Sequence, residues 1–157
     1  MSDTGITVRD VSDGDHAAWA QHFRAYRDFY RLEPDEHVVS RVWDWLRDPE
    51  GEVRGLVALD GDRVVGVAHY RRVASPSSGS HGLYLDDLFT TPDARGRGVG
   101  RALIGHLAAR AAAEGLSGVS WITADDNATA RRLYDSLATA THWVTYELTP
   151  TEGPPAT

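Results

Sequence analysis

The chain has 157 residues, of which 41% are hydrophobic and 25% charged, and its formal net charge is −7. This length suits one domain with a sizeable core, and the absence of cysteine excludes disulfides, thiolate metal sites and thiol nucleophiles. The acidic balance disfavours binding to nucleic acid or anionic membranes, and because the sequence shows neither a signal peptide nor a membrane span, we expect a cytoplasmic protein.

The first half of the chain predicts a strand, two helices and a hairpin. The stretch ITVRDV (6–11) alternates between apolar and polar residues, as a strand does. Aromatic residues then recur at helical spacing, which predicts a helix ending near Arg31, and a second amphipathic stripe follows Pro34. Two β-rich runs, RGLVALD and RVVGVAHYRRV, flank Gly61, which predicts a tight hairpin turn because glycine readily adopts a positive φ.

The middle of the chain predicts a strand that leads into a helix through a glycine-rich loop. SPSSGSHG (75–82) is rich in small residues and predicts a loop, and LYLDDLFTT (83–91) predicts the strand that follows. The helix after RGRGVG (95–100) has an apolar face and ends with Gly115 as its C-terminal cap. GVSWIT (118–123) predicts a further short strand.

The C-terminal part predicts one more helix and one more strand. Asp125 or Asn127 can cap a helix that buries one apolar face, and WVTYEL (143–148) has the composition of a strand. The tail 150–157 is rich in proline and threonine, and we expect it to be disordered. The apolar face of the helix consists of Ala130, Leu133 and Leu137.

These elements predict an α/β (α+β) chain with a mixed sheet, folded as a single domain over residues 4–149. The hairpin pairs its strands antiparallel. The strand, loop, helix and strand around RGRGVG form a unit that we expect to pair in parallel through a right-handed crossover.

The loop RGRGVG (95–100) predicts an anion site. Its glycines allow close backbone approach, so that consecutive N–H groups at the start of a helix point to one spot, and the nearby arginines can grip phosphate oxygens. A P-loop is excluded because Gly100 is followed by Arg101 and Ala102, and a dinucleotide fingerprint would need glycine in place of Arg101. A strand-to-helix turn with solvated arginines and a small nucleic-acid patch are the alternatives.

Read with its flanks, this loop resembles the signature of the GCN5-related N-acetyltransferase superfamily. The signature is Arg or Gln, any two residues, Gly, any residue, then Gly or Ala, and it is matched by Arg95, Gly98 and Gly100. The family also has an Asn followed on the next helix by a Tyr, which Asn127 and Tyr134 match. Two ordered motifs at this separation indicate the superfamily.

The resemblance spans residues 6–149, and the stretches YRDFY and DDLF are similar to the branch that contains diamine and polyamine acetyltransferases. It implies a mixed, splayed central β-sheet of about six to seven strands flanked by about four helices. It also implies acetyl-CoA as co-substrate, with its pyrophosphate on the loop amides and its pantetheine beside the preceding strand, no metal, and a homodimer. The implied cofactor-binding residues are Leu88, Phe89, Thr90, Arg95, Gly96, Arg97, Gly98, Val99, Gly100, Arg101, Asn127 and Tyr134.

Acetyl transfer to an amine needs one group that takes the amine proton and another that protonates the leaving thiolate. The resemblance assigns the second role to Tyr134. For the first we expect a carboxylate, acting directly or through water. Asp86 and Asp87 are adjacent on a strand, so they face opposite sides unless a bulge intervenes, and Asp86, which shares a face with Tyr84, is favoured. The residues expected to bind the acceptor are Tyr26, Tyr30, Glu33, Tyr84, Asp86 and Asp87.

Direct transfer is expected because no cysteine is available to carry the acetyl group. The acceptor is then a small primary amine of the polyamine, amino acid or aminoglycoside type. A protein or peptide N-acetyltransferase and a noncatalytic acyl-CoA-binding module are the alternatives. The isolated histidines His69, His81 and His142 predict structural or exposed positions, and the sequence shows no metal-ligand cluster.

Overall fold

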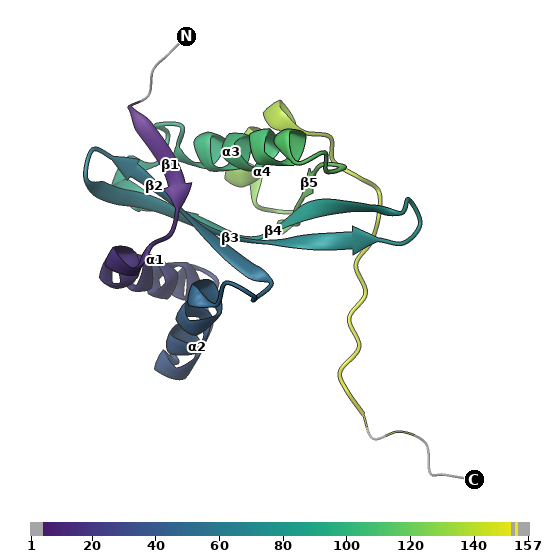
Figure 1. The fold of residues 1–157 in the computed structure, drawn as a ribbon, viewed down its shortest axis with the longest axis horizontal. Helices are drawn as coiled ribbons and strands as arrows, with labels where there is room; N and C mark the ends of the chain where they lie inside the picture. Colours follow the sequence, from purple (N-terminus) through teal and green to yellow (C-terminus); the bar gives the residue numbers. More distant parts are fainter. Residues whose placement is uncertain (1–4, 152, 154–157) are drawn as a thin grey trace. The chain divides into compact units, whose positions relative to one another are not determined.

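The computed structural model describes residues 5–151 and 153. The chain forms two compact units, the first ending at Thr123 and the second beginning at Ala124. The first unit holds a β-sheet with helices, and the second holds one helix and the C-terminal segment (Figure 1). Most of the tail 150–157, predicted to be disordered, lies outside the described residues. No helix in the described ranges is long and apolar enough to cross a membrane.

The strands of the first unit are β1 (Ile6–Asp10), β2 (Val53–Asp60), β3 (Arg63–Ser75), β4 (Ser80–Thr90) and β5 (Val119–Ser120). They form one sheet in the order β1-β2-β3-β4-β5. Neighbouring strands are antiparallel except β4 and β5, which are parallel, so the predicted mixed sheet is confirmed. Gly61 has a φ of 62° in the turn between β2 and β3, as the hairpin prediction requires.

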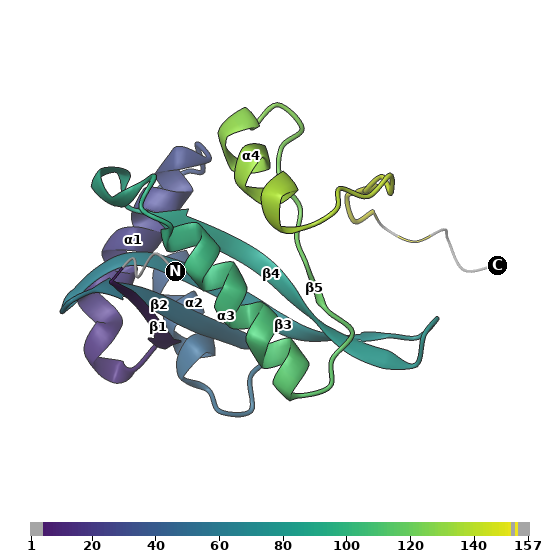
Figure 2. The same cartoon turned by 90° about the horizontal axis from the view of Figure 1, so that it is seen from above.

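Three helices pack on this sheet, α1 (His16–Phe29), α2 (Glu36–Arg47) and α3 (Val99–Ala113). α1 and α2 lie on one face and α3 lies on the other (Figures 1 and 2). α2 begins where it does because the Asp35 side chain accepts hydrogen bonds from the first backbone N–H groups of the helix. With α4 (Ala128–Leu137) in the second unit, the described residues contain four helices, the number that the resemblance implies.

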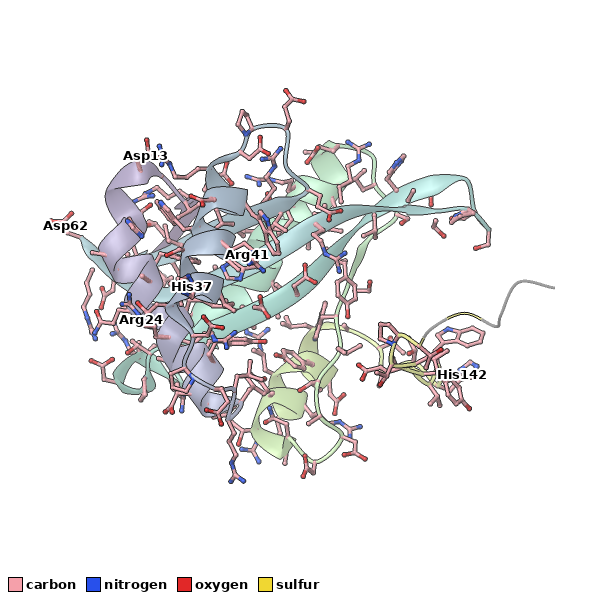
Figure 3. The ribbon with its side chains drawn as sticks, turned by 90° about the horizontal axis from the view of Figure 1, so that it is seen from below. Asp13, Arg24, His37, Arg41, Asp62 and His142 are labelled. Carbon is pink, nitrogen blue, oxygen red and sulfur yellow. The ribbon has the colours of Figure 1, made fainter. Side chains whose placement is uncertain are left out.

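An aromatic core fills the space between α1, α2 and the sheet. Trp19 of α1 is fully buried, with its ring centroid 5.2 Å from that of Trp43, and Phe89 of β4 belongs to the same cluster. The helical spacing of the aromatic residues predicted a buried face of α1. The prediction is confirmed for Trp19 and Phe23 and is wrong for Phe29 and Tyr30, which are 54% and 45% exposed. Arg24 of α1 and Arg41 of α2 are exposed on the outer surface of the helix pair (Figure 3).

The sheet has five strands and not six to seven, and WVTYEL (143–148) is not a strand. A composition typical of strands favours extended backbone, but a strand also needs a partner edge, and composition does not supply one. The large apolar side chains of this segment are 74% to 92% exposed. They are Trp143, Val144, Tyr146 and Leu148.

Two further expectations are corrected by the structure. The loop 75–82 is a tight turn, because β3 and β4 continue to a pairing of Ser75 with Ser80. α4 buries none of its residues completely, and Leu137 is 37% exposed although it was expected in the core. Asn127 caps this helix, which settles the choice between Asp125 and Asn127.

Candidate active site

A β-bulge in β4 brings the two adjacent acids to the same face of the sheet. His69 of β3 pairs with Asp87, and the next residue, Tyr70, pairs with Leu85, so Asp86 is the extra residue of the bulge. Asp87 bonds to His69 and Asp86 bonds to Arg71. His69 and Arg71 are alternate residues of one strand and therefore point to one face. The bulge is the exception to strict alternation that allows both carboxylates to face the side of α1.

Asp87 is held by a buried hydrogen-bond chain that begins in the aromatic core. The Trp19 Nε1–H group donates to His69 Nε2 at 2.9 Å, and His69 Nδ1 lies 2.8 Å from an oxygen of Asp87. Because Nε2 accepts, the ring proton sits on Nδ1 and is donated to Asp87. The Tyr26 hydroxyl also bonds to Asp87. His69 is only 2% exposed, so this chain is fixed inside the core.

The surroundings of Asp87 keep its carboxylate charged. Burial raises the pKa of Asp87, but the hydrogen bonds from His69 and Tyr26 and the nearby Arg71 cation outweigh burial and hold that pKa below its ordinary value. Burial and the charge of Asp87 raise the pKa of Tyr26, so its hydroxyl keeps its proton and acts as a donor. Asp87 is thus an anion whose direct hydrogen-bond donors are uncharged groups.

Asp86 has a different environment from its neighbour. Arg71 binds both of its oxygens, with Nε and Nη2 each 2.8 Å from a carboxylate oxygen. The Arg71 guanidinium also lies over the ring of Tyr84, 5.4 Å from its centroid. Most of the Asp86 charge is therefore compensated locally, and Tyr84 joins the site through Arg71.

The end of α1 presents aromatic rings next to this network. The rings of Tyr26 and Tyr30 are 4.8 Å apart, and Tyr30 is 45% exposed. Tyr26 and Tyr30 thus extend from Asp87 to the surface of the protein. The side chain of Glu33 is exposed, and the contact described for this residue is its carbonyl oxygen, which accepts from Arg27. The structure therefore does not bring Glu33 into the network.

The predicted anion site lies at the N-terminus of α3. Gly96 and Gly98 have φ values of 78° and 82°, and Gly98 is the N-cap residue with no side chain capping the helix. Arg95 packs over Phe29 of α1, and Arg97 pairs with Asp60 at 2.9 Å. These two arginine side chains are thus engaged with the protein. The backbone N–H groups at the start of α3 and the helix dipole are the features here that favour an anion.

Among the residues that the structure describes, no strand pairs with the β5 side of β4 beyond Tyr84, and this stretch is called the open edge. β5 pairs with Leu83 and Tyr84 only, although β4 continues to Thr90. The N–H of Thr91 donates to Val65 of β3, and because strand N–H groups alternate in direction, those of Leu88 and Thr90 point to the open edge. Leu88, Phe89 and Thr90, the residues predicted for pantetheine, lie on this part of the strand.

The second unit holds the remaining predicted residues. The Asn127 side chain accepts from the N–H of Ala130 at 3.3 Å, so it begins α4. Tyr134 lies on the same helix, about two turns further on and on the same side as Asn127. The spacing of the family motif is thus the spacing of one helix face.

Sequence reasoning missed three residues of the carboxylate network. Trp19 reads as a core aromatic, His69 reads as an isolated histidine, and Arg71 carries no motif. One signal was available, since His69 and Arg71 occupy alternate positions of a strand opposite the DD pair. Polar side chains such as His69 and Arg71 need hydrogen-bond partners when they lie on a face that packs against aromatic helices. The adjacent acids Asp86 and Asp87 are the partners on the opposite strand.

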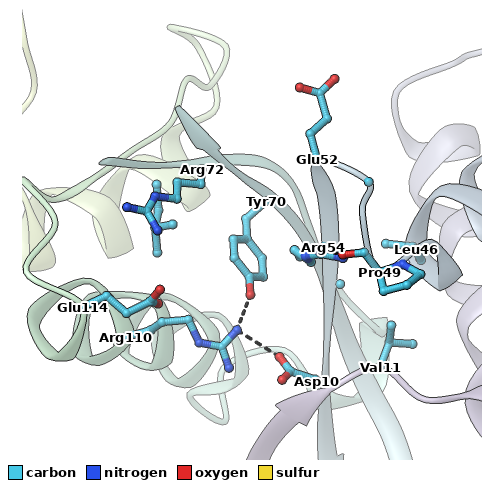
Figure 4. A pocket seen from close by; sticks show the side chains of 13 residues that line it. Asp10, Val11, Leu46, Pro49, Glu52, Arg54, Tyr70, Arg72, Arg110 and Glu114 are labelled. Atoms are coloured by element: carbon cyan, nitrogen blue, oxygen red, sulfur yellow. Dashed lines mark hydrogen bonds and ion pairs between the residues drawn. The ribbon is translucent and has the colours of Figure 1, made fainter. Parts of the chain in front are cut away.

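A separate pocket of about 670 Å³ lies near the C-terminal end of α3 (Figure 4). Arg110 of α3 contacts Tyr70 and bonds to Asp10 at 2.9 Å, and Arg54 donates to backbone carbonyls. None of the residues predicted for the site lines this pocket. Several of its polar groups already have partners in the protein, so the carboxylates of β4 and the start of α3 remain the candidate site.

Comparison with known proteins relates most of the chain to one family. The sequence model of the Acetyltransferase (GNAT) family matches residues 17–138. The D-amino-acid N-acetyltransferase HPA3 of Saccharomyces cerevisiae is 31% identical over 150 residues, which cover 94% of this chain and 92% of that protein.

Solved structures of acetyltransferases share the fold. A ribosomal-protein-alanine N-acetyltransferase from Brucella melitensis biovar Abortus 2308 superposes with a TM-score of 0.76 at 23% identity, covering 92% of this chain and 98% of that one. AAC(6')-Iy in complex with the bisubstrate analogue CoA-S-monomethyl-acetylneamine gives a TM-score of 0.76 at 16% identity, covering 93% and 99%. At these identities the likeness concerns the fold.

Proposed function

The chain belongs to the Acetyltransferase (GNAT) family and is an N-acetyltransferase of that family, and we propose that it moves an acetyl group from acetyl-CoA directly to the primary amine of a small molecule. The observation that carries this proposal is the bulge at Asp86, which puts two carboxylates on one face beside the Tyr26 hydroxyl. A cationic amine suits this face because Asp87 is ionised and its direct hydrogen-bond donors are uncharged.

The start of α3 and the open edge of β4 fit the donor acetyl-CoA. The backbone from Gly96 to Arg101 would hold the pyrophosphate, because the helix start lacks a side-chain cap and its glycines allow close approach. Leu88 and Thr90 would hydrogen-bond the pantetheine arm as an added strand does. When bound, acetyl-CoA supplies the activated thioester. A backbone N–H near Thr90 would polarise the thioester carbonyl, and its direction toward the open edge supports this role.

The amine must lose a proton before it can attack, since an alkyl ammonium group has a pKa of about 10. Asp87 holds the ammonium group and takes this proton, directly or through water. Asp86, the residue favoured from the sequence, is the competing candidate, although Arg71 occupies both of its oxygens. The neutral amine attacks the thioester carbonyl, so the N–C bond forms and the C–S bond breaks, and Tyr134 protonates the departing thiolate. Of the two protons that the ammonium group loses, one is balanced by the proton on the CoA thiol and the other is released from Asp87 to water.

The amino acid type is the first acceptor to test. The yeast relative named above is a D-amino-acid N-acetyltransferase, and it shares 31% identity over nearly the whole chain. Arg71 pairs with Asp86 through Nε and Nη2, but its side chain is 35% exposed and would also attract the carboxylate of such a substrate. Polyamines, as in the diamine and polyamine branch, and aminoglycosides are the other two types.

The test is a panel of D- and L-amino acids, polyamines and aminoglycosides, scored for release of CoA thiol from acetyl-CoA. We expect turnover with at least one panel member and a loss of about 10²–10⁴-fold in kcat on Asp87→Asn, the range of general acid–base catalysis. The matched variant Asp86→Asn separates the two acids, and Tyr134→Phe tests the acid role. Binding of acetyl-CoA without turnover of any amine would indicate an acyl-CoA-binding module, and turnover of peptides alone would indicate a protein acetyltransferase.

The proposal also includes a homodimer in the cytoplasm. The support for a dimer is the exposed apolar segment 143–148, because side chains of this size are normally covered in a soluble protein. Light scattering after size exclusion measures the mass directly. A dimer that becomes a monomer on Tyr146→Asp with Leu148→Asp would support the role of this segment, and a monomeric wild-type protein would refute it.

A further inference from the structure

We propose that His69 is a positioning residue for the acceptor site, and that Trp19 fixes it in the one tautomer that can orient Asp87. This inference rests on the proposed function, because it gives Asp87 the acceptor amine as its ligand. It assigns a role to Trp19 of α1 and His69 of β3, which belong to neither the glycine loop nor β4 and act on the acceptor site through Asp87. Its physical basis is the direction of two hydrogen bonds.

The direction of these bonds follows from donor chemistry. An indole nitrogen can only donate, so the 2.9 Å contact requires His69 Nε2 to be the acceptor. The remaining ring nitrogen then carries the proton and donates to Asp87 at 2.8 Å. The other tautomer would put two N–H groups face to face at Trp19 and would leave His69 without a proton to donate to the carboxylate. Trp19 therefore selects the state of the histidine that holds Asp87.

Four groups surround the Asp87 carboxylate, and His69 is the one that fixes its orientation from the buried side. His69 and Arg71 face it from β3, Tyr26 faces it from α1, and Asp86 is its neighbour on β4. The ring of Tyr30, the residue that follows α1, lies 4.8 Å from that of Tyr26 and is tilted by 52° to it. Of these groups, His69 is the one buried behind the carboxylate, at 2% exposure, so it fixes the carboxylate from the side opposite to solvent.

If His69 and Trp19 only packed in the core, their substitution would lower the stability of the protein without a specific effect on Asp87. Trp19 and His69 also pack in the aromatic core, where the ring of Phe23 lies 5.3 Å from Trp19 and 5.1 Å from His69. Any substitution in this cluster lowers stability through lost packing. The positioning role alone depends on an N–H group aimed at Asp87, so its test must separate that N–H from the volume of the ring.

The experiment compares three variants of the full-length protein. His69→Leu keeps an apolar volume and removes the N–H group, His69→Asn supplies an amide N–H near the position of Nδ1, and Phe23→Leu is the matched packing control. We expect His69→Leu to lower kcat/KM for the amine by about tenfold to a hundredfold, the effect of one hydrogen bond to a charged group. KM for acetyl-CoA should stay within about twofold, and His69→Asn should recover most of the loss.

The pH profile supplies the decisive readout. The hydrogen bond from His69 lowers the pKa of Asp87, so its loss in His69→Leu should move the acid limb of kcat/KM to higher pH, and His69→Asn should move it back. Phe23→Leu should lower the melting temperature without moving that limb. The proposal is overturned if His69→Leu and Phe23→Leu give the same profile, or if His69→Asn behaves like His69→Leu.

A second measurement does not depend on the stability of the leucine variant. Nitrogen NMR of the wild-type histidines should show His69 with its proton on Nδ1, and Trp19→Phe should give a mixture of tautomers. A single Nδ1–H tautomer that persists in Trp19→Phe would remove Trp19 from the proposal. If the wild-type protein acetylates none of the panel amines, the proposed function fails; if it is active and the His69 variants match the packing control, the positioning role fails.

Discussion

Gly66→Ala should displace the glycine loop (95–100) from beneath, because the added Cβ pushes against Val99 at the end of the loop. Gly66 lies on β3 directly beneath the first turn of α3. A Cβ at this position would lie 2.6 Å from Cγ1 of Val99 and 3.3 Å from Cδ1 of Leu103. Val99 and Leu103 are 2% and 0% exposed, so neither side chain can turn away into solvent. Val99 is also β-branched and has one favoured rotamer in a helix, so the helix itself must move.

The size of this movement and its cost follow from the contact distances. The gap to Val99 must open by about 0.8 Å to reach ordinary contact at 3.4 Å. Overpacking of this kind costs about 1–3 kcal/mol, and the lower entropy of the unfolded alanine chain offsets about 0.4–1 kcal/mol of it. We therefore expect a net loss of about 1–2 kcal/mol, or roughly 2–8 °C in Tm. A shift of this size at backbone donors should raise KM for acetyl-CoA by about tenfold.

The assay combines thermal unfolding with the dependence of CoA release on acetyl-CoA concentration. Gly105→Ala is the matched control, because Gly105 is on the same helix and a Cβ there meets nothing within 4 Å. It should raise stability by about 0.5–1 kcal/mol and leave KM unchanged. Adding Val99→Ala to Gly66→Ala removes the 2.6 Å contact and leaves the 3.1 Å contact with the Phe89 carbonyl oxygen, so it should recover most of the change in KM. An unchanged KM in Gly66→Ala would refute the reasoning that the loop is set by the packing of α3 on β3.

Three further substitutions test local features. Asp15→Asn removes the buried partner of Arg9, whose hydrogen bond outweighs burial and lowers the pKa of Asp15 on folding. The resulting stabilisation is present above about pH 4 and is lost as the pH falls through the folded pKa. Urea unfolding of this variant should therefore show a loss of about 1–3 kcal/mol at pH 7 and little difference from wild type near pH 2. Gly98→Ala should cost about 1–2 kcal/mol because its φ is 82°, and should weaken acetyl-CoA binding measured by calorimetry. Asn127→Ala should cost about 1 kcal/mol of α4 stability, visible as faster amide exchange in that helix, and unchanged exchange would contradict the cap.

The fold could be predicted where local chemistry determines it. The hairpin at Gly61 and the burial of Trp19 and Phe23 each follow from a few neighbouring residues. The start of α4 was also predictable, although the sequence left Asp125 and Asn127 as alternative caps. The strand WVTYEL (143–148) could not be predicted in the same way, because a strand depends on an edge elsewhere in the chain. α4 shows the same limit: its apolar periodicity indicates a face that can be buried, and only tertiary structure decides whether something covers it.

In the candidate site, too, the part determined by neighbouring residues could be predicted and the part that depends on tertiary contacts could not. The glycine loop is predictable because its conformation is a property of Gly96 and Gly98 themselves. The network around Asp87 depends on residues from α1, β3 and β4, which are far apart in sequence. His69 and Trp19 are 50 residues apart, and no spacing rule connects them. Isolated histidines in strands are usually structural. The contacts of His69 with Trp19 and Asp87, which distinguish it, exist only in the folded protein.

The bulge itself has a physical cause that the sequence contains. Leu85 pairs with Tyr70 on the face of α3, where Leu103 and Leu107 are fully buried. With Asp87 fixed by His69 on the opposite face, strict alternation would turn the carboxylate of residue 86 into this apolar layer and move Leu85 out of it. An unpaired buried carboxylate costs several kcal/mol, whereas one disrupted ladder hydrogen bond costs about 1 kcal/mol. The bulge is therefore the arrangement of lower free energy, and two adjacent acids within an apolar strand are a signal for it in the amino-acid sequence.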